Sequence, residues 1–163
     1  APGLKRAQRD ALTGLYNKKT TQELIERSLE EGEAESCNGL LIMDVDYFKQ
    51  VNDTYGHIVG DKVLKTFGHL LARQFREHDI AGRIGGDEFL VLIPGITENL
   101  FQSMIRSMLV DMAKSSVHLA LGSVWVDDCT GKVEKSLSEA DARMYEDKRA
   151  YYAKNRQLDR RRH

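Results

Sequence analysis

Residues 80–93 have the sequence Ile-Ala-Gly-Arg-Ile-Gly-Gly-Asp-Glu-Phe-Leu-Val-Leu-Ile. Two apolar halves flank the segment Gly85-Gly86-Asp87, and this pattern predicts a β-hairpin with an acidic tip. A Pro-Gly pair at residues 94–95 then ends the second strand. The stretch therefore supplies two neighbouring antiparallel strands of a sheet.

The rest of the chain alternates between extended and helical hydrophobic patterns. Strands are predicted at residues 39–45, 80–84, 88–93 and 117–126, and helices at residues 18–31, 60–77, 98–114 and 136–153. The helix at 98–114 contains three methionines, for which core packing is favoured over a soft binding surface. Strands interleaved with helices indicate an α/β (α+β) domain with helices packed on one sheet.

The chain has 163 residues, of which 41% are hydrophobic and 30% are charged, as expected for one soluble domain. Its net charge of −1 argues against a binder of nucleic acid polymers, although the last ten residues carry a local excess of basic side chains. Cys37 and Cys129 are too few for a disulfide scaffold, so a reducing, cytoplasmic setting is expected. No apolar run approaches the roughly 20 residues of a membrane span, so no membrane contact is expected within this segment.

Acidic residues lie where the predicted strands end. Asp44 and Asp46 close the strand at 39–45, and Asp87 and Glu88 lie at the hairpin tip. If the two strands are neighbours, these carboxylates converge at one edge of the sheet, where a hard cation such as Mg²⁺ would relieve their repulsion. Solvated turn acids are the simpler alternative. That alternative is weaker for Asp44 and Asp87, because both adjoin strongly apolar segments.

The connection at residues 47–61 is punctuated by glycines and contains a lysine, an amide and several carboxylates. Asn52 and Asp61 could be turn and capping residues, with Asp61 at the N-cap of the next helix. They could equally bind the edge of a nucleobase, because a carboxylate beside an amide can pair with guanine. The hairpin glycines allow a tight turn and a close approach of the backbone to a ligand.

Gly85-Gly86-Asp87-Glu88-Phe89 is the signature of the GGDEF family, the diguanylate cyclases, and the chain resembles this family in three further motifs. They are Asp10-Ala11-Leu12-Thr13-Gly14-Leu15-Tyr16-Asn17, Asp44-Val45-Asp46-Tyr47-Phe48-Lys49 with Asn52-Asp53, and Gly56-His57 with Gly60-Asp61. Residues 9–153 are therefore identified as a GGDEF domain. Residues 1–8 are expected to end an upstream linker or signalling helix, and residues 154–163 to form a basic C-terminal tail.

The resemblance implies a central, mainly antiparallel sheet flanked by helices, related to nucleotidyl cyclases and polymerase palms. It implies that two GTP molecules are condensed into cyclic di-GMP, with release of two pyrophosphates, by a homodimer whose active sites face each other. The expected cofactor is Mg²⁺ or Mn²⁺, two ions per active site. An upstream sensory domain would control the enzyme, in the cytoplasm or in the cytoplasmic part of a membrane-anchored sensor.

The resemblance also assigns roles to single positions. Asp44, Asp87 and the carbonyl of Val45 would ligate the metal ions. Glu88 would assist the metal or the attacking 3′-hydroxyl. The expected GTP contacts are Asn52 and Asp61 on guanine, the turn at Gly85 and Gly86, and Phe48, Lys49 and Lys148, with backbone N–H groups around Tyr47 and Phe48, on the phosphates. Since related enzymes that make mixed dinucleotides have a small hydroxyl residue in place of Asp61, guanine is expected at both positions.

Arg76 and Asp79 match the RxxD pattern of the family's product-binding inhibitory site, with five residues between Asp79 and Gly85. An arginine can bind guanine N7 and O6 through two parallel hydrogen bonds, and a carboxylate can accept from N1–H. A helix-end ion pair is the alternative interpretation of this short pattern. Arg106, on the helix after the hairpin, is a candidate second arginine.

Two departures from the family pattern stand out. Lys18 replaces the usual arginine of the opening motif, and Tyr151, Tyr152 and Ala153 replace the Gly-Arg-Asn that usually follows Lys148. Because the lost arginine would help bind phosphate, a second hypothesis is a catalytically weak module that binds GTP or cyclic di-GMP for regulation. A different polymerase-like palm fits the carboxylates but not the set of motifs.

Overall fold

The computed structural model describes residues 8–31, 38–45, 53–75, 79–114, 118–128 and 131–162, without the side chains of 28–31 and 155–162. Its main elements follow the chain in the order α2 (Lys18–Glu31), β1 (Gly39–Val45), α4 (His57–Gln74), β2 (Ile80–Arg83), β3 (Glu88–Ile93), α5 (Glu98–Ala113), β4 (Leu119–Trp125) and α6 (Val133–Arg162). All four predicted strands and all four predicted helices are present, with ends that differ by up to three residues except at the C-terminus of α6.

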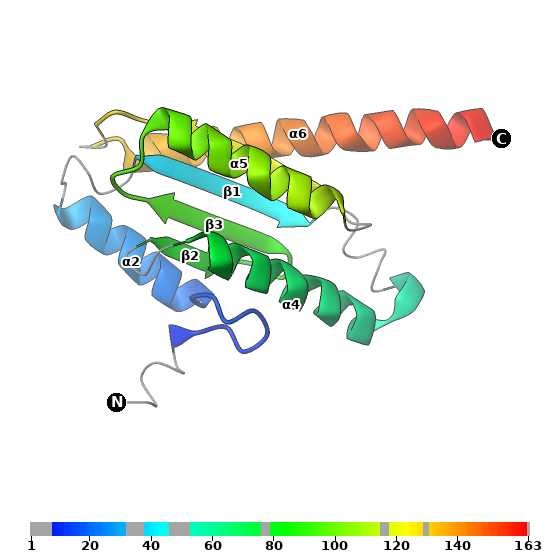
Figure 1. The fold of residues 1–163 in the computed structure, drawn as a ribbon, viewed down its shortest axis with the longest axis horizontal. Helices are drawn as coiled ribbons and strands as arrows, with labels where there is room; N and C mark the ends of the chain where they lie inside the picture. Colours follow the sequence, from blue (N-terminus) through cyan, green and yellow to red (C-terminus); the bar gives the residue numbers. More distant parts are fainter. Residues whose placement is uncertain are drawn as a thin grey trace.

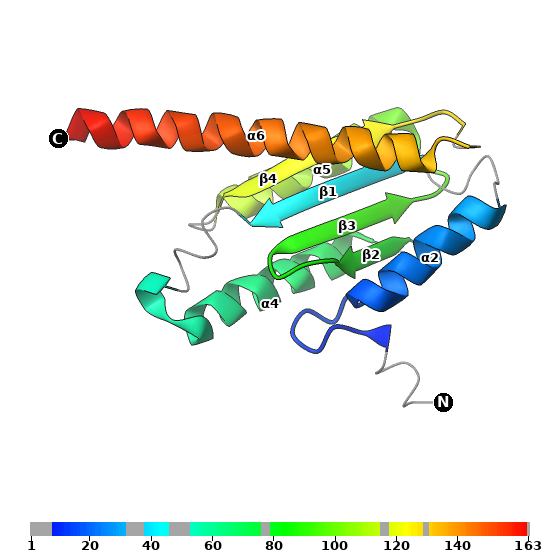
Figure 2. The same ribbon diagram turned by 180° about the vertical axis from the view of Figure 1, so that it is seen from behind.

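The four strands form one antiparallel sheet in the order β2-β3-β1-β4 (Figure 2). Strands β2 and β3 pair as the predicted hairpin, and β1 lies between β3 and β4. In this register Asp44 is opposite Glu88, and Val45 is opposite Leu119. The expected antiparallel sheet is confirmed, and the end of β1 meets the hairpin tip at one edge.

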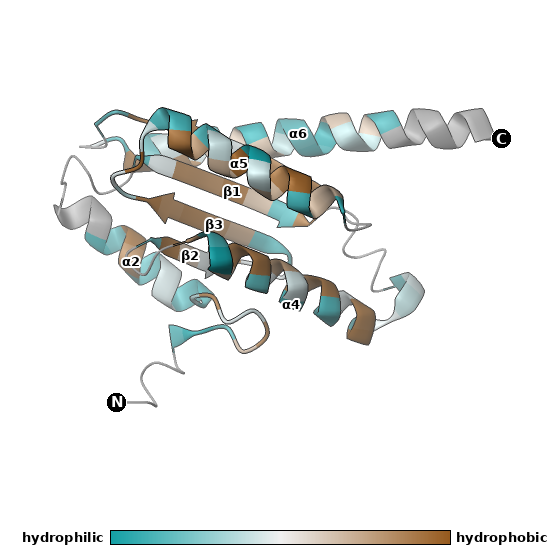
Figure 3. Ribbon diagram, viewed as in Figure 1, coloured by the Kyte–Doolittle hydropathy of each residue, from teal (hydrophilic) through white to brown (hydrophobic). Residues whose placement is uncertain are grey.

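Helices cover both faces of the sheet. Helices α4 and α5 pack on the face shown in Figure 1, where Leu64, Phe67 and Met108 are buried. Helices α2 and α6 cover the opposite face, seen in Figure 2. All seven residues of β1 are buried, which explains why the strand is apolar along most of its length and becomes hydrophilic only near its end, at Asp44 (Figure 3).

The methionines of α5 are part of the core, as predicted: Met108 and Met112 are buried, and Met104 packs partly buried against them. In the part of the chain that is described, no helix combines the length and the apolar character needed to cross a membrane.

Two helix ends differ from the sequence prediction. Helix α4 begins at His57 after Gly56, whose φ of 88° favours glycine, so Asp61 lies inside the helix and the expected N-cap at Asp61 is wrong. Helix α6 begins at Val133 and runs to Arg162, well beyond the predicted end at residue 153, and its last turns project past the sheet (Figure 1). No glycine or proline interrupts this segment, and its many lysine, arginine and glutamate residues are good helix formers.

Gly122 sets how closely α6 approaches the sheet. A Cβ atom at this position would lie 2.5 Å from the backbone nitrogen of Met144 and would overlap the carbonyl oxygen of Ala140. The α6 backbone therefore packs directly on β4, which is possible only because residue 122 has no side chain. Gly122 pairs with Ile42 of β1, so this contact also fixes α6 along β1.

Candidate active site

Asp44 lies on the α6 face of the sheet near the end of β1. Side chains alternate along a strand, so Asp44 shares a face with Leu40 and Ile42, which pack in the cluster under α6. Two residues of strand from Ile42 to Asp44 advance about 6.8 Å, and four residues of helix from Met144 to Lys148 advance about 6 Å. The register at Gly122 therefore carries Lys148 to Asp44.

Lys148 and Asp44 form an ion pair in which Lys148 Nζ donates to Asp44 Oδ2 at 2.6 Å. Asp44 is only 3% exposed, and its Oδ1 is buried with no hydrogen-bond partner among the described residues. Burial raises the pKa of Asp44 to about 6 against the opposing effect of Lys148, and the neighbouring Asp87 carboxyl raises it further. The structure thus brings Asp44, Asp87 and Lys148 together, although they come from three different elements.

Backbone hydrogen bonds join the hairpin tip to the end of β1 and close the turn itself. The N–H of Val45 donates to the carbonyl of Asp87 at 3.0 Å, and the N–H of Ile84 donates to the carbonyl of Glu88 at 2.9 Å. The side chain of Glu88 folds over Gly85, where an added Cβ would lie 3.4 Å from Glu88 Oε2. The tip is therefore a fixed turn rather than a loose connection.

The Asp44 and Asp87 carboxylates fit a hard divalent cation. A buried carboxylate oxygen without a donor, beside a second carboxylate, is stabilised by a positive charge at that point. Within the described residues no group of three or more His, Cys, Asp or Glu side chains is arranged to hold a metal ion. Mg²⁺ usually takes one or two protein carboxylates and completes its shell with phosphate oxygens and water, so two carboxylates are sufficient.

Arg83 is a site residue that the sequence analysis missed. Its guanidinium donates from Nε and Nη2 to the carbonyl of Gly86, at 3.1 and 2.7 Å, and from Nη1 to Asp10 Oδ1 at 3.2 Å. Burial raises the pKa of Asp10, but hydrogen bonds from Thr13 and the charge and hydrogen bond of Arg83 outweigh it, so the net shift is downward. Arg83 thus ties the hairpin tip to the N-terminal motif.

Aromatic side chains stand at the positions after Lys148 where this chain departs from the family pattern, and they form a small aromatic group with His118. Tyr151 stacks on His118 with ring centroids 3.7 Å apart, and the Tyr152 ring centroid is 6.0 Å from Lys148 Nζ. Burial lowers the pKa of His118, and the charge of Asp147 opposes this shift. Because His118 directly precedes β4, the aromatic group lies at the same edge of the sheet as Asp44.

Of the residues expected to contact GTP, Asp61 lies exposed in the second turn of α4, while Asn52, Phe48 and Lys49 lie outside the described residues. Asp46 and Tyr47 also lie outside them. Gly85 and Gly86 form the hairpin turn, and a Cβ at Gly86 would have no atom within 4 Å. Of the two residues predicted to contact guanine, Asn52 and Asp61, only Asp61 lies within the described part of the chain.

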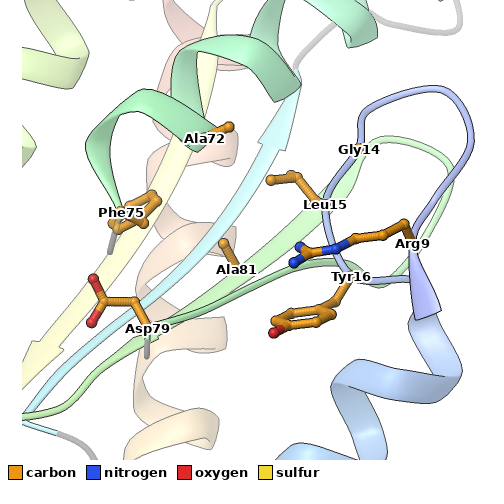
Figure 4. A pocket seen from close by; sticks show the side chains of 8 residues that line it. All are labelled: Arg9, Gly14, Leu15, Tyr16, Ala72, Phe75, Asp79 and Ala81. Atoms are coloured by element: carbon orange, nitrogen blue, oxygen red, sulfur yellow. The ribbon is translucent and has the colours of Figure 1, made fainter. Parts of the chain in front are cut away.

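Asp79 lies away from this edge, just before β2, and is 5% exposed. It lines a cavity of about 310 Å³ together with Arg9, Tyr16 and Phe75 (Figure 4), and a second cavity of about 260 Å³ beside α5. The Arg9 guanidinium lies 4.2 Å from the centroid of the Tyr16 ring.

The two arginines proposed for this region are placed differently. Arg76 lies outside the described residues. Arg106 is exposed on α5 and is not among the described residues that line either cavity.

Comparison with known proteins finds relatives along almost the whole chain. The chain is 30% identical over 159 residues to diguanylate cyclase DgcP of Pseudomonas aeruginosa, covering 96% of this chain and 24% of that protein. It is 32% identical over 148 residues to diguanylate cyclase DgcS of Shewanella oneidensis, covering 89% of this chain and 49% of that protein. The chain therefore spans at most about half the length of these relatives.

Among solved structures, the GGDEF domain of DgcB from Caulobacter crescentus, determined in complex with c-di-GMP, superposes with a TM-score of 0.79 at 25% identity, over 88% of this chain and 89% of that chain. A family model described as "Diguanylate cyclase, GGDEF domain" matches residues 7–154. This match extends over the whole sheet and its flanking helices, except for the last turns of α6. The chain belongs to the diguanylate cyclase GGDEF domain family.

Proposed function

We propose that this chain is the catalytic domain of a diguanylate cyclase, which joins two GTP molecules into cyclic di-GMP and releases two pyrophosphates. The observation that carries the proposal is the meeting of Asp44 and Asp87 at the end of β1, with Lys148 bonded to Asp44. A buried carboxylate beside a half-buried one, with a flexible lysine ammonium group next to them, suits a metal-bound triphosphate.

The residues present would hold Mg²⁺ or Mn²⁺, two ions per site, through Asp44, Asp87 and the carbonyl of Val45. When bound, such ions neutralise phosphate charge and favour ionisation of the attacking 3′-hydroxyl. Glu88, whose side chain lies beside Gly85, would assist this hydroxyl, and the turn at Gly85 and Gly86 would let the backbone approach the nucleotide closely.

The other GTP contacts follow the family pattern. Asn52 and Asp61 would bind guanine at both positions of the product, and Phe48, Lys49 and Lys148 would bind the phosphates. Lys148 has the firmest support, because α6 already delivers its ammonium to the site.

Activity requires two copies of the domain. One domain holds one GTP, and each 3′-hydroxyl must attack the α-phosphate of the other nucleotide in line, so two sites must face each other. We therefore expect a homodimer in the cytoplasm that is controlled by an upstream sensory domain, and an isolated monomer of very low activity.

Product inhibition at Arg76 and Asp79 is the regulatory part of the proposal. It is supported by the cavity beside Asp79, which offers a carboxylate, the Arg9 guanidinium and aromatic walls to a flat base. Arg106 stays a candidate second arginine, and Arg9 is an additional one. Arg76→Ala should relieve inhibition by cyclic di-GMP without lowering the initial rate; unchanged inhibition would rule out this site.

The alternative is a catalytically weak module that binds GTP or cyclic di-GMP. It is favoured by the tyrosines that replace the phosphate-binding arginine after Lys148. The discriminating experiment fuses the domain to a dimeric coiled coil, adds GTP and Mg²⁺, and analyses the nucleotides. Cyclic di-GMP supports the cyclase, whereas a folded dimer that binds GTP and forms no product supports the binding module.

A further inference from the structure

Lys148 already neutralises one oxygen of a proposed metal ligand. Its Nζ lies 2.6 Å from Asp44 Oδ2, while Asp44 Oδ1 is buried and has no hydrogen-bond partner in the described part of the chain. The same carboxylate therefore offers one oxygen to a protein cation and one to a ligand. A metal ion that bound Asp44 would have to share it with the ammonium group.

The two partners of this ion pair differ in freedom. Asp44 is fixed, because its side chain is 4% exposed and its backbone belongs to the central strand. The Lys148 side chain is 27% exposed and ends in an ammonium group on a flexible four-carbon chain. The ammonium group can therefore leave Asp44 by rotation of the side chain alone, with α6 still packed on β4 through Gly122.

A divalent cation and an ammonium group on one carboxylate repel each other, and water screens this repulsion weakly at a buried site. The repulsion falls if the ammonium group moves to another acceptor. The phosphate groups of a nucleotide bound at this edge provide such acceptors, and phosphates are preferred partners of lysine.

We propose that Lys148 is an internal counter-cation of Asp44, which weakens metal binding until the phosphates of a nucleotide receive its ammonium group. The inference rests on the proposed function, because it assumes that metal and nucleotide share this edge. The movement of the Lys148 ammonium group from Asp44 to the phosphates makes the metal and the nucleotide bind cooperatively, because each strengthens the binding of the other.

This role differs from that of a lysine that only binds phosphate. A phosphate-binding lysine influences the nucleotide and leaves the affinity for metal alone unchanged. An internal counter-cation affects the two ligands in opposite directions. Lys148→Met should therefore bind metal alone more tightly and nucleotide more weakly.

The test is a titration of the whole chain with Mn²⁺ in the absence of nucleotide, with free Mn²⁺ measured by electron paramagnetic resonance. Lys148→Met should bind Mn²⁺ on the order of tenfold more tightly than the wild type, within the usual range of coupling between sites. Lys135→Met, an exposed lysine of the same helix, is the matched control and should equal the wild type. Adding Asp44→Asn to Lys148→Met should remove the gain.

In a second titration a non-hydrolysable GTP analogue is present, and it should increase the Mn²⁺ affinity of the wild type more than that of Lys148→Met. Unchanged or weaker Mn²⁺ binding by both Lys148→Met and Lys148→Gln, with folding confirmed by circular dichroism, would overturn the inference. A gain that survives Asp44→Asn would overturn it too. If the wild type binds neither Mn²⁺ nor the analogue, the proposed function fails as well; if it binds both and Lys148 has no effect, only the inference fails.

Discussion

Replacing Gly122 by alanine tests how the fold positions the active-site edge. The added Cβ would overlap the carbonyl oxygen of Ala140 and lie 2.5 Å from the nitrogen of Met144. Both atoms belong to the helix backbone, so no side-chain rotation can relieve the contact. Ordinary van der Waals contact starts at 3.4 Å, so α6 has to withdraw by at least about 1 Å.

The expected loss of stability follows from this displacement. Overpacking of this kind costs about 1–3 kcal/mol of unfolding free energy, which lowers the melting temperature of a domain of this size by about 3–10 °C. A shift of this size also moves the α6 backbone away from Asp44 and weakens the 2.6 Å contact between Lys148 Nζ and Asp44 Oδ2. The variant should therefore lose both stability and part of its nucleotide affinity.

Thermal unfolding followed by circular dichroism measures the first effect, and titration with a GTP analogue measures the second. Gly86→Ala is the control for stability, because its added Cβ meets no atom within 4 Å, and it should melt within about 2 °C of the wild type. If Gly122→Ala melts as the wild type does, α6 does not pack on β4 as described and the placement of Lys148 loses its structural basis.

Three further predictions concern the hairpin tip and the N-terminal motif. Asp87→Ala should abolish formation of cyclic di-GMP in a forced dimer while the variant stays folded. Retained product would refute the assignment of Asp87 as a metal ligand. Arg83→Met should lower kcat by roughly 10- to 100-fold, because the hairpin tip loses two hydrogen bonds and its tie to Asp10; steady-state kinetics at wild-type levels would contradict this positioning role. The pKa of Asp10 is lowered from 3.8, so its ionised form stabilises the fold above that pH and the stabilisation is lost as the pH falls through the lower, folded-state value. In urea unfolding, Asp10→Asn should therefore lower the free energy of unfolding by about 1–2 kcal/mol at pH 7, and by progressively less below pH 4. A loss of unfolding free energy that does not depend on pH would contradict this role of Asp10.

The sheet and its helices could be predicted largely from local pattern. The hairpin at 80–93 and the apolar strand at 39–45 each carry their signal within a few residues, and their pairing brings Asp44 opposite Glu88. The convergence of Asp44 and Asp87 followed because both lie at strand ends of one antiparallel sheet.

The contacts that the sequence did not predict are long-range. Arg83 meets Asp10 across 73 residues, and Lys148 meets Asp44 across 104 residues. No local periodicity encodes such pairs. Lys148 meets Asp44 because β1 lies beside β4 and Gly122 lets α6 approach the sheet. Arg83 meets Asp10 because Tyr16 of the N-terminal motif pairs with Gly82 of β2.

Helix ends were predicted less well, for an identifiable reason. Asp61 has the side chain of an N-cap, but the positive φ of Gly56 starts α4 four residues before it. Asparagine, aspartate and glycine can all begin a helix, and the tertiary fold selects among them.

We propose above that Asp44 and Asp87 hold the metal of a nucleotide site. The most direct measurement is the anomalous diffraction of a crystal of the domain grown with Mn²⁺ and a non-hydrolysable GTP analogue. We expect a manganese peak bonded by both carboxylates, with the analogue's phosphates beside it and Lys148 turned toward them. A bound analogue with manganese elsewhere, or with Lys148 still on Asp44, would contradict it.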